Sequence, residues 1–506
     1  MDTTSENNKR IAKNTVFLYL RMLLIMLVGL YTSRVVLQVL GVSDYGIYSV
    51  VGGVIGMLGY FNILLSGGTS RFLTVALGKG DKSLLCSTFS TSLSLALISS
   101  LIVLLLGETI GLWFVINKLN IPEGRETAAI WVYHCALITS AIAILQNPFT
   151  ASIISHEKMS VYAYISIFES LAKLGIVYLL LTVSYDKLET YAVLLSLVAL
   201  VNLAFYAVYC RVSFFECRLR PSIDRTLLGE MFTYSGWNML GSISSILNNY
   251  GINILLNIFF GTIVNASRGI ASQVCGLVQQ FCGNFQMAAR PQITKYYAVG
   301  QIQDMTDLII ANARYSAYLV LLLIVPLGMN IEGVLNMWLT EVPQYAASFI
   351  LLVFLQILFF ALDGPVGIGI QAVGKMKLPN ILSGIVYISI FPITYIVLKL
   401  GGSPITSYVV TILTTPVILF MDVFILRKYT QFDVPLFCRK AIGSTLYVGA
   451  VSVLLPILMS FSLSGGVFAT LLKLLVDFVY VAVIIFYCGL TSNDRNKVYH
   501  ILRIKK

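Results

Sequence analysis

The sequence predicts an all-α polytopic membrane protein with about 14 transmembrane helices. Three observations lead to this fold class: 58% of the residues are hydrophobic, only 11% are charged, and apolar runs recur along the whole chain. Soluble domains carry about 25% charged residues, and a helix needs about 20 apolar residues to cross a bilayer. Backbone groups in lipid must bond to one another, so these long runs favour helices over a closed barrel.

Hydropathy windows of about 19 residues place the individual helices. The first apolar run continues from Val16 toward Leu40 without a small-residue cleavage site, which predicts an uncleaved first helix. The predicted spans are 14–38, 46–68, 84–107, 127–149, 160–182, 190–210, 232–260, 264–289, 308–330, 345–370, 380–400, 404–426, 440–461 and 467–489.

Basic residues predict the orientation in the membrane. Most of the 34 Lys and Arg residues lie at the two chain ends and in alternate breaks between spans. The remaining breaks carry Arg34, Lys118, Arg125, Lys187, Arg268 and Lys399. Positive loops stay in the cytoplasm, so both termini are predicted to be cytoplasmic. The net charge of +11 is scattered in short clusters, which argues against nucleic acid as a partner.

The two halves of the chain resemble each other at an offset of about 220 residues. Gly41 and Gly261 each precede a break between two long spans, and Arg71 and Arg290 each close the second span of a copy. An even number of spans separates the copies, so they are predicted to be related by a parallel pseudo-twofold axis along the membrane normal. The predicted domains are 1–225 (spans 1–6), 226–430 (spans 7–12), and 431–506 with two extra spans and a basic tail.

The segment NTVFLYLRMLLIMLVGLYTSRVVLQVLGVSDYGIYSVVGG, residues 14–53, resembles the first two helices of Wzx-type polysaccharide flippases. These belong to the multidrug/oligosaccharidyl-lipid/polysaccharide exporter superfamily. The resemblance implies two six-helix lobes around a V-shaped cavity and transport by alternating access. It also implies an undecaprenyl-pyrophosphate-linked oligosaccharide as cargo, moved from the cytoplasmic to the periplasmic leaflet for surface polysaccharide such as lipopolysaccharide or capsule.

Polar residues form stripes on three predicted spans. Span 8 carries Arg268, Ser272, Gln279, Gln286 and Arg290 on one face. Span 7 carries Asn238, Ser242, Ser245, Asn249 and Asn253, and span 2 carries Ser49, Gly53, Gly56, Tyr60, Gly67 and Arg71. Amides bind sugar hydroxyls, so Gln279, Gln286, Asn249 and Asn253 are predicted to contact substrate in a cavity. Hydrogen bonding between helices remains the alternative, and the small-residue face of span 2 suits either a helix or a ligand.

Five arginines are predicted to bind substrate: Arg21, Arg71 and Arg290 at the pyrophosphate, and Arg34 and Arg268 at the far mouth of the cavity. Guanidinium pairs with phosphate through two parallel hydrogen bonds and is weakly hydrated. Snorkelling of Arg21 to the interface, and topology or anchoring roles for the others, remain open.

Acidic residues inside predicted spans are the candidates for ion coupling. Glu169 and Lys173 on span 5 and Asp363 on span 10 are predicted to serve this purpose, with H+ or Na+ as the ion. Glu169 and Lys173 are also four residues apart, which suits simple mutual neutralisation. Asp363 precedes the glycine-rich sequence GPVGIG, which could unwind the helix locally.

Enzyme functions find little support in the sequence. The chain has three histidines, no Walker loop, no nucleophile elbow and no CxxC pair among its eight cysteines, so no ATP hydrolysis, cofactor or metal is predicted. A cation-coupled drug exporter of the same superfamily and a membrane polysaccharide polymerase or ligase remain alternatives. Membrane lipid is an expected partner, and association with polysaccharide polymerase machinery stays open.

Overall fold

The computed structural model describes residues 2–58, 69–70, 72–74, 76–77, 80–156, 158–218, 224–229, 247–375, 377–460, 466–492 and 494–496. Only the backbone is described at 2–23, 58, 247, 249, 288, 291, 298 and 460. Within these ranges every regular element is a helix, which confirms the predicted all-helical fold class. The chain divides into two compact units, Met1–Ala266 and Ser267–Lys506, called unit 1 and unit 2 below.

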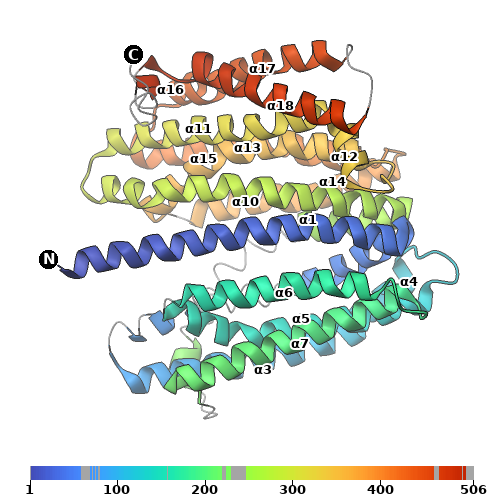
Figure 1. The fold of residues 1–506 in the computed structure, drawn as a ribbon. Coiled ribbons are helices and arrows are strands. Elements are labelled where there is room, and N and C mark those ends of the chain that lie inside the picture. The colour runs from blue at the N-terminus through green and yellow to red at the C-terminus, as the bar shows by residue number, and fades with distance from the viewer. Residues whose placement is uncertain are drawn as a thin grey trace. The chain divides into compact units, whose positions relative to one another are not determined.

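Unit 1 is a bundle of long helices that run side by side (Figure 1). Its elements are α1 (Asp2–Leu58), α3 (Lys82–Leu106), the π-helical turn η1 (Gly107–Gly111), α4 (Leu112–Lys118), α5 (Glu126–Ser155), α6 (Met159–Leu179), α7 (Lys187–Ser213), the 3-10 turn η2 (Phe215–Cys217), the π-helical turn η3 (Leu247–Gly251) and α9 (Ile252–Phe260). Apolar residues of α1, α3, α5 and α7 fill one core, and Asp81 and Asp186 cap the N-termini of α3 and α7.

Unit 2 contains most of α10 (Thr262–Ala298), which crosses the boundary between the units. Its further elements are α11 (Ile302–Met329), α12 (Ile331–Trp338), α13 (Ala346–Val373), α14 (Lys377–Lys399), α15 (Thr406–Thr430), α16 (Val434–Phe437), the π-helical turn η4 (Cys438–Gly443), α17 (Ser444–Ser460), α18 (Val467–Ile484) and the π-helical turn η5 (Ile485–Gly489). Helix α13 packs between α11 and α15, and α17 and α18 pack on α11.

Eleven helical stretches among the described residues are long and apolar enough to cross a membrane. They match the predicted spans, with spans 1 and 2 merged in the stretch Leu24–Met57. Span 7 falls partly on residues 232–246, which lie outside the described residues. Span 8 corresponds to α10, a helix of 37 residues whose many polar side chains keep it outside this apolar set.

The glycines that align in the sequence repeat adopt the same backbone conformation. Gly41 breaks α1 with φ 79° and ψ 168°, and Gly261 separates α9 from α10 with φ 79° and ψ −171°. Side chains other than hydrogen rarely tolerate this region, so glycine is required at both breaks. The predicted domain boundary after residue 225 remains a prediction, and α9 packs within unit 1.

Candidate substrate and coupling sites

Four asparagines and one carbonyl form a hydrogen-bonded group, called the asparagine network. Asn253 Nδ2 donates to the carbonyl of Ser49 at 3.1 Å, and Asn265 Nδ2 donates to Asn253 Oδ1 at 2.8 Å. Asn257 Nδ2 donates to Asn265 Oδ1 at 3.1 Å and to the carbonyl of Asn120 at 3.2 Å. The N–H of Asn120 donates to Asn257 Oδ1 at 2.7 Å. The network joins α1, α9, α10 and the segment after α4.

The small-residue face of span 2 lies against helices where the structure describes it. A Cβ on Gly46 would stand 2.1 Å from the carbonyl oxygen of Thr262, and one on Gly53 would stand 2.9 Å from Asn253 Nδ2. The glycines therefore let α1 approach α9 and α10 more closely than any side chain allows. Tyr60, Gly67 and Arg71 of this face lie outside the described residues.

The predicted stripe on α10 divides between buried and exposed positions. Gln286 is 4% exposed, and its Nε2 donates to the carbonyl of Ala361 on α13 at 3.1 Å. Arg268 is half-buried with its guanidinium over the ring of Tyr408, 5.2 Å from the centroid. Ser272 and Arg290 are exposed, and Gln279 is half-buried.

An exposed polar face of α10 adjoins that stripe. Ser272, Gly276 and Gln280 are spaced by four residues, and all three are exposed. This face therefore carries small and amide side chains that no other described element covers. Gln279 is the predicted substrate residue that stands nearest in sequence to this face.

The remaining predicted arginines have different surroundings. Arg34 is half-buried on α1, and Arg290 Nη1 lies 3.8 Å from the Met287 sulfur on an exposed turn of α10. The side chains of Arg21 and Asn249 lie outside the described residues, as does Arg71.

The predicted coupling residues fall into two places. Lys173 Nζ donates to Glu169 Oε1 at 2.6 Å along α6, in the pairing that mutual neutralisation requires. Asp363 lies on α13 and Asp422 on α15, two helices that pack together, and Tyr387 lies on α14, which also packs on α15. One carboxylate oxygen of each aspartate is buried without a hydrogen-bond partner among the described residues. No sequence pattern links Asp422 with Asp363, although each is a lone acid within an apolar run.

A charge cluster at one end of unit 1 was missed by sequence reasoning. Arg125, just before α5, donates through Nε to Asp44 Oδ1 at 2.9 Å and through Nη1 to Asp186 Oδ2. Hydrogen bonding to Arg125 lowers the pKa of Asp186, and hydrogen bonding to Asp186 raises the pKa of Arg125. This Arg125 cluster joins α1, α5 and α7 at the end where the asparagine network lies.

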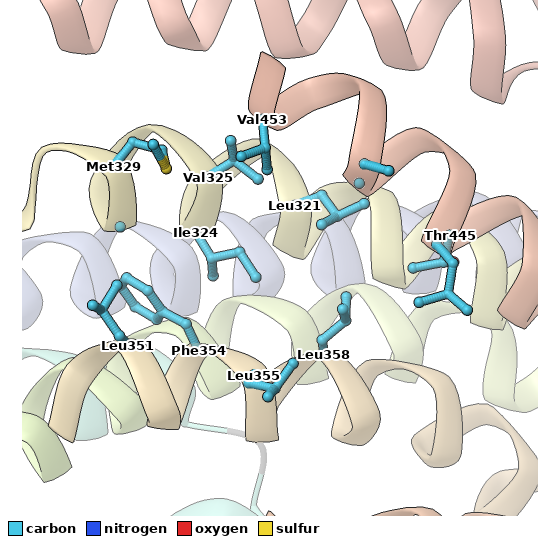
Figure 2. A pocket seen from close by; sticks show the side chains of 14 residues that line it. Leu321, Ile324, Val325, Met329, Leu351, Phe354, Leu355, Leu358, Thr445 and Val453 are labelled. Carbon is cyan, nitrogen blue, oxygen red and sulfur yellow. The ribbon is translucent and has the colours of Figure 1, made fainter. Parts of the chain in front are cut away.

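Unit 2 contains an apolar groove of about 600 Å³ between α11, α13 and α17. Figure 2 shows Leu321 and Ile324 of α11 near Phe354 of α13, with Val453 and Thr445 of α17 on a third side. Thr445 supplies the only hydroxyl group of the lining. The groove therefore suits a flexible hydrocarbon chain and offers little to a polar ligand.

The described part of the chain has neither a three-residue metal-binding cluster nor a disulfide bond. No three His, Cys, Asp or Glu residues there come close enough together to hold a metal ion. All eight cysteines are free, and four of them are buried.

The chain has the fold of two kinds of membrane transporter whose structures are solved. The lipid II flippase MurJ in an inward closed conformation superimposes with a TM-score of 0.68 and 11% identity, over 97% of this chain and 100% of that one. An inward-facing multidrug resistance MATE family transporter gives 0.54 and 14% identity, over 93% and 98% of the two chains.

A curated relative is similar in sequence as well. The uncharacterized membrane protein EpsK of Bacillus subtilis (strain 168) is 21% identical over 319 residues. The match spans 63% of this chain and 63% of that protein. No family model matches the chain.

Proposed function

We propose that the chain is a Wzx-type flippase that moves an undecaprenyl-pyrophosphate-linked oligosaccharide from the cytoplasmic to the periplasmic leaflet. The translocated molecule serves surface polysaccharide biosynthesis. The protein lies in a bacterial inner membrane, with both chain termini in the cytoplasm. The two six-span copies, 1–225 and 226–430, move against each other, and 431–506 adds two peripheral spans.

The observation that carries this proposal is the presence of two chemically different surfaces in unit 2. Helix α10 exposes Ser272, Gly276 and Gln280, which suit a hydrated glycan. The groove between α11, α13 and α17 is lined almost entirely by apolar groups, which suit an isoprenoid chain. A cargo with a sugar head and a long lipid tail needs both surfaces. The structural likeness to MurJ, a lipid II flippase, supports a lipid-linked cargo.

Arginines supply the charge that a pyrophosphate requires. Arg290 is exposed on α10, and we assign it, with Arg21 and Arg71, to the pyrophosphate. Arg34 and Arg268 are assigned to the far mouth of the path. Gln279 and Asn249 are assigned to the sugars, whereas Asn253 and Gln286 reach cargo only when their present hydrogen bonds to α1 and α13 break.

Membrane potential can drive this step. The cytoplasm is negative, so outward movement of about two negative charges is favoured by roughly 4 to 5 kcal/mol per 100 mV. Counter-movement of H+ or Na+ would add to this driving force. Asp363 is the candidate site, with Asp422 on the adjacent helix α15, and Glu169 with Lys173 is a second candidate.

A cation-coupled drug exporter is the second candidate function. The likeness to a MATE family transporter and the unpartnered carboxylate oxygens of Asp363 and Asp422 favour it. A cationic drug does not need the α11–α13–α17 groove, so filling that groove should leave drug export unchanged. Replacing Ala450 by Phe in the groove should instead stop transport of a lipid-linked cargo.

The test is flipping in vesicles that hold the purified protein and a fluorescent undecaprenyl-pyrophosphate-linked oligosaccharide. A potassium gradient with valinomycin sets the potential without a proton or sodium gradient. Arg290→Ala should abolish flipping and Arg290→Lys should restore part of it, because lysine loses the two-point phosphate contact. Arg427→Ala, at an exposed arginine on α15, is the matched control and should flip normally. Normal flipping by Arg290→Ala would overturn the arginine role, and cationic dye export without flipping would favour the drug exporter.

A further inference from the structure

The asparagine network connects parts of the chain that the sequence repeat assigns to different copies. Asn253 and Asn257 lie on α9 and Asn265 lies on α10, both in the second copy. Their partners, Ser49 on α1 and Asn120 before α5, belong to the first copy. Basic residues in the adjoining breaks are few, so this end is predicted to be extracytoplasmic.

The three asparagines that α9 and α10 contribute to the network are buried, and their side chains hydrogen-bond to one another. Asn257 and Asn265 are 0% exposed and Asn253 is 6% exposed. Asn265 Nδ2 also donates to the backbone carbonyl of Asn253 at 2.7 Å, so it holds α9 and α10 together at the Gly261 break. Buried amides without partners would cost stability, which explains why they are grouped here.

We propose that the asparagine network is the extracytoplasmic latch of the transport cycle. It is closed in this structure and must open for cargo to leave toward the periplasm. This proposal rests on the proposed function, because it assumes that the two copies separate at this end during transport.

Neutral amides suit a contact that must open and close repeatedly. When α9 and α10 move away from α1, each amide exchanges a protein partner for water at a small net cost. A buried ion pair in the same place would leave uncompensated charges on opening, which costs far more. The glycines of α1 contribute in the closed state, since Gly46 and Gly53 allow the close approach that aligns the hydrogen bonds.

A reversible cross-link across the latch tests the proposal. The Cβ built on Gly53 lies 3.8 Å from Asn253 Cβ, which matches the mean distance in disulfides of about 3.8 Å. The pair Gly53→Cys with Asn253→Cys should therefore form a disulfide on oxidation. Flipping should stop when the disulfide forms and should return, on reduction, to the level of the Asn253→Cys single variant.

The control is a cross-link between helices that move together. Thr139 Oγ1 on α5 and Ser196 Oγ on α7 lie 3.0 Å apart within the first copy. The pair Thr139→Cys with Ser196→Cys should cross-link and leave flipping unchanged. Full flipping with the Gly53–Asn253 disulfide closed would overturn the latch.

A second readout needs no substrate. Gly276→Cys places a thiol on the exposed face of α10, where nothing lies within 4 Å, and an impermeant maleimide added outside reports outward opening. Background labelling of the native cysteines is subtracted. Asn257→Ala should raise the labelling rate roughly tenfold, since it removes several hydrogen bonds of the closed state. The Gly53–Asn253 disulfide should suppress labelling.

The two readouts separate the latch from the cargo. Labelling that follows the latch without any flipping would sink the proposed function and leave the latch intact. Flipping that persists while Asn257→Ala leaves the labelling rate unchanged would overturn the latch and leave the proposed function intact.

Discussion

The Arg125 cluster and the asparagine network lie at the same end of unit 1 and use opposite chemistry. The Arg125 cluster joins α1, α5 and α7, all within the first copy, through two carboxylates on one guanidinium. The asparagine network joins the first copy to α9 and α10 through neutral amides. The difference teaches that charge is used where helices stay together, and amides where the proposed cycle separates them.

The energetics of opening explain this division. Charged hydrogen bonds are about twice as strong as neutral ones, and breaking a partly buried ion pair strands its charges. An amide pair contributes about 1 kcal/mol and is readily replaced by water. The Arg125 cluster is therefore expected to act as a fixed clamp beside a latch that moves.

Removal of the clamp should cause the largest effect on stability. Arg125→Ala leaves Asp44 and Asp186 close together without their shared cation, and should lower the free energy of unfolding by about 2 to 3 kcal/mol. Thermal unfolding in detergent, followed by size-exclusion chromatography, measures this loss. Lys118→Ala at the same end is the control, because Lys118 is exposed and contacts only the face of Trp113 among the interactions described. Equal melting temperatures for the two variants would contradict the clamp.

The close approach of α1 to α10 should produce the second largest effect. Gly46→Ala would force a methyl group to within 2.1 Å of the Thr262 carbonyl oxygen, and the backbone must shift to accept it. A loss of about 2 kcal/mol is expected, as for other overpacked positions.

Gly52→Ala is a matched control on the same helix. Gly52 is exposed, and nothing lies within 4 Å of the position its Cβ would take. Alanine favours a helix over glycine, so this variant should melt at or slightly above the wild-type temperature. If both glycine variants melt alike, α1 and α10 do not approach as closely as the structure describes.

Much of the fold could be predicted from the sequence because lipid allows few solutions. Long apolar runs had to be helices, and the aligned glycines Gly41 and Gly261 marked breaks that the structure confirms. Helical phase also placed Asn253 on a polar face of its span. The helical phase alone could not show whether that face lines a cavity or packs on a helix, because an amide finds hydrogen-bond partners in either place.

Pairings between distant residues could not be predicted. Arg125 lies 81 positions from Asp44 and 61 from Asp186, and each looked like an ordinary loop residue in the sequence. Asn257 follows Asn253 by four residues, so a longer stripe on that span could have revealed it. Asp422 gave a weaker signal, an unpaired acid in an apolar run, and only the packing of α13 on α15 shows that it lies on a helix next to that of Asp363.

The smallest expected effect is a change in how the melting temperature depends on pH. The Arg125 cluster contains carboxylates that titrate in acid, whereas the asparagine network does not titrate. The folded protein holds the pKa of Asp186 below its ordinary value through the Arg125 hydrogen bond, so the pairing adds stability above about pH 4. That stability is lost as the pH falls further, through the lowered pKa that Asp186 has in the folded protein. Asp186→Asn removes this titration, and its melting temperature should fall less steeply with acid than that of the wild type. Asn257→Ala should melt lower at every pH and parallel the wild-type profile, because amides do not titrate. Melting curves between about pH 3 and pH 7 measure the slopes, and a wild-type slope in Asp186→Asn would show that the clamp does not depend on this carboxylate.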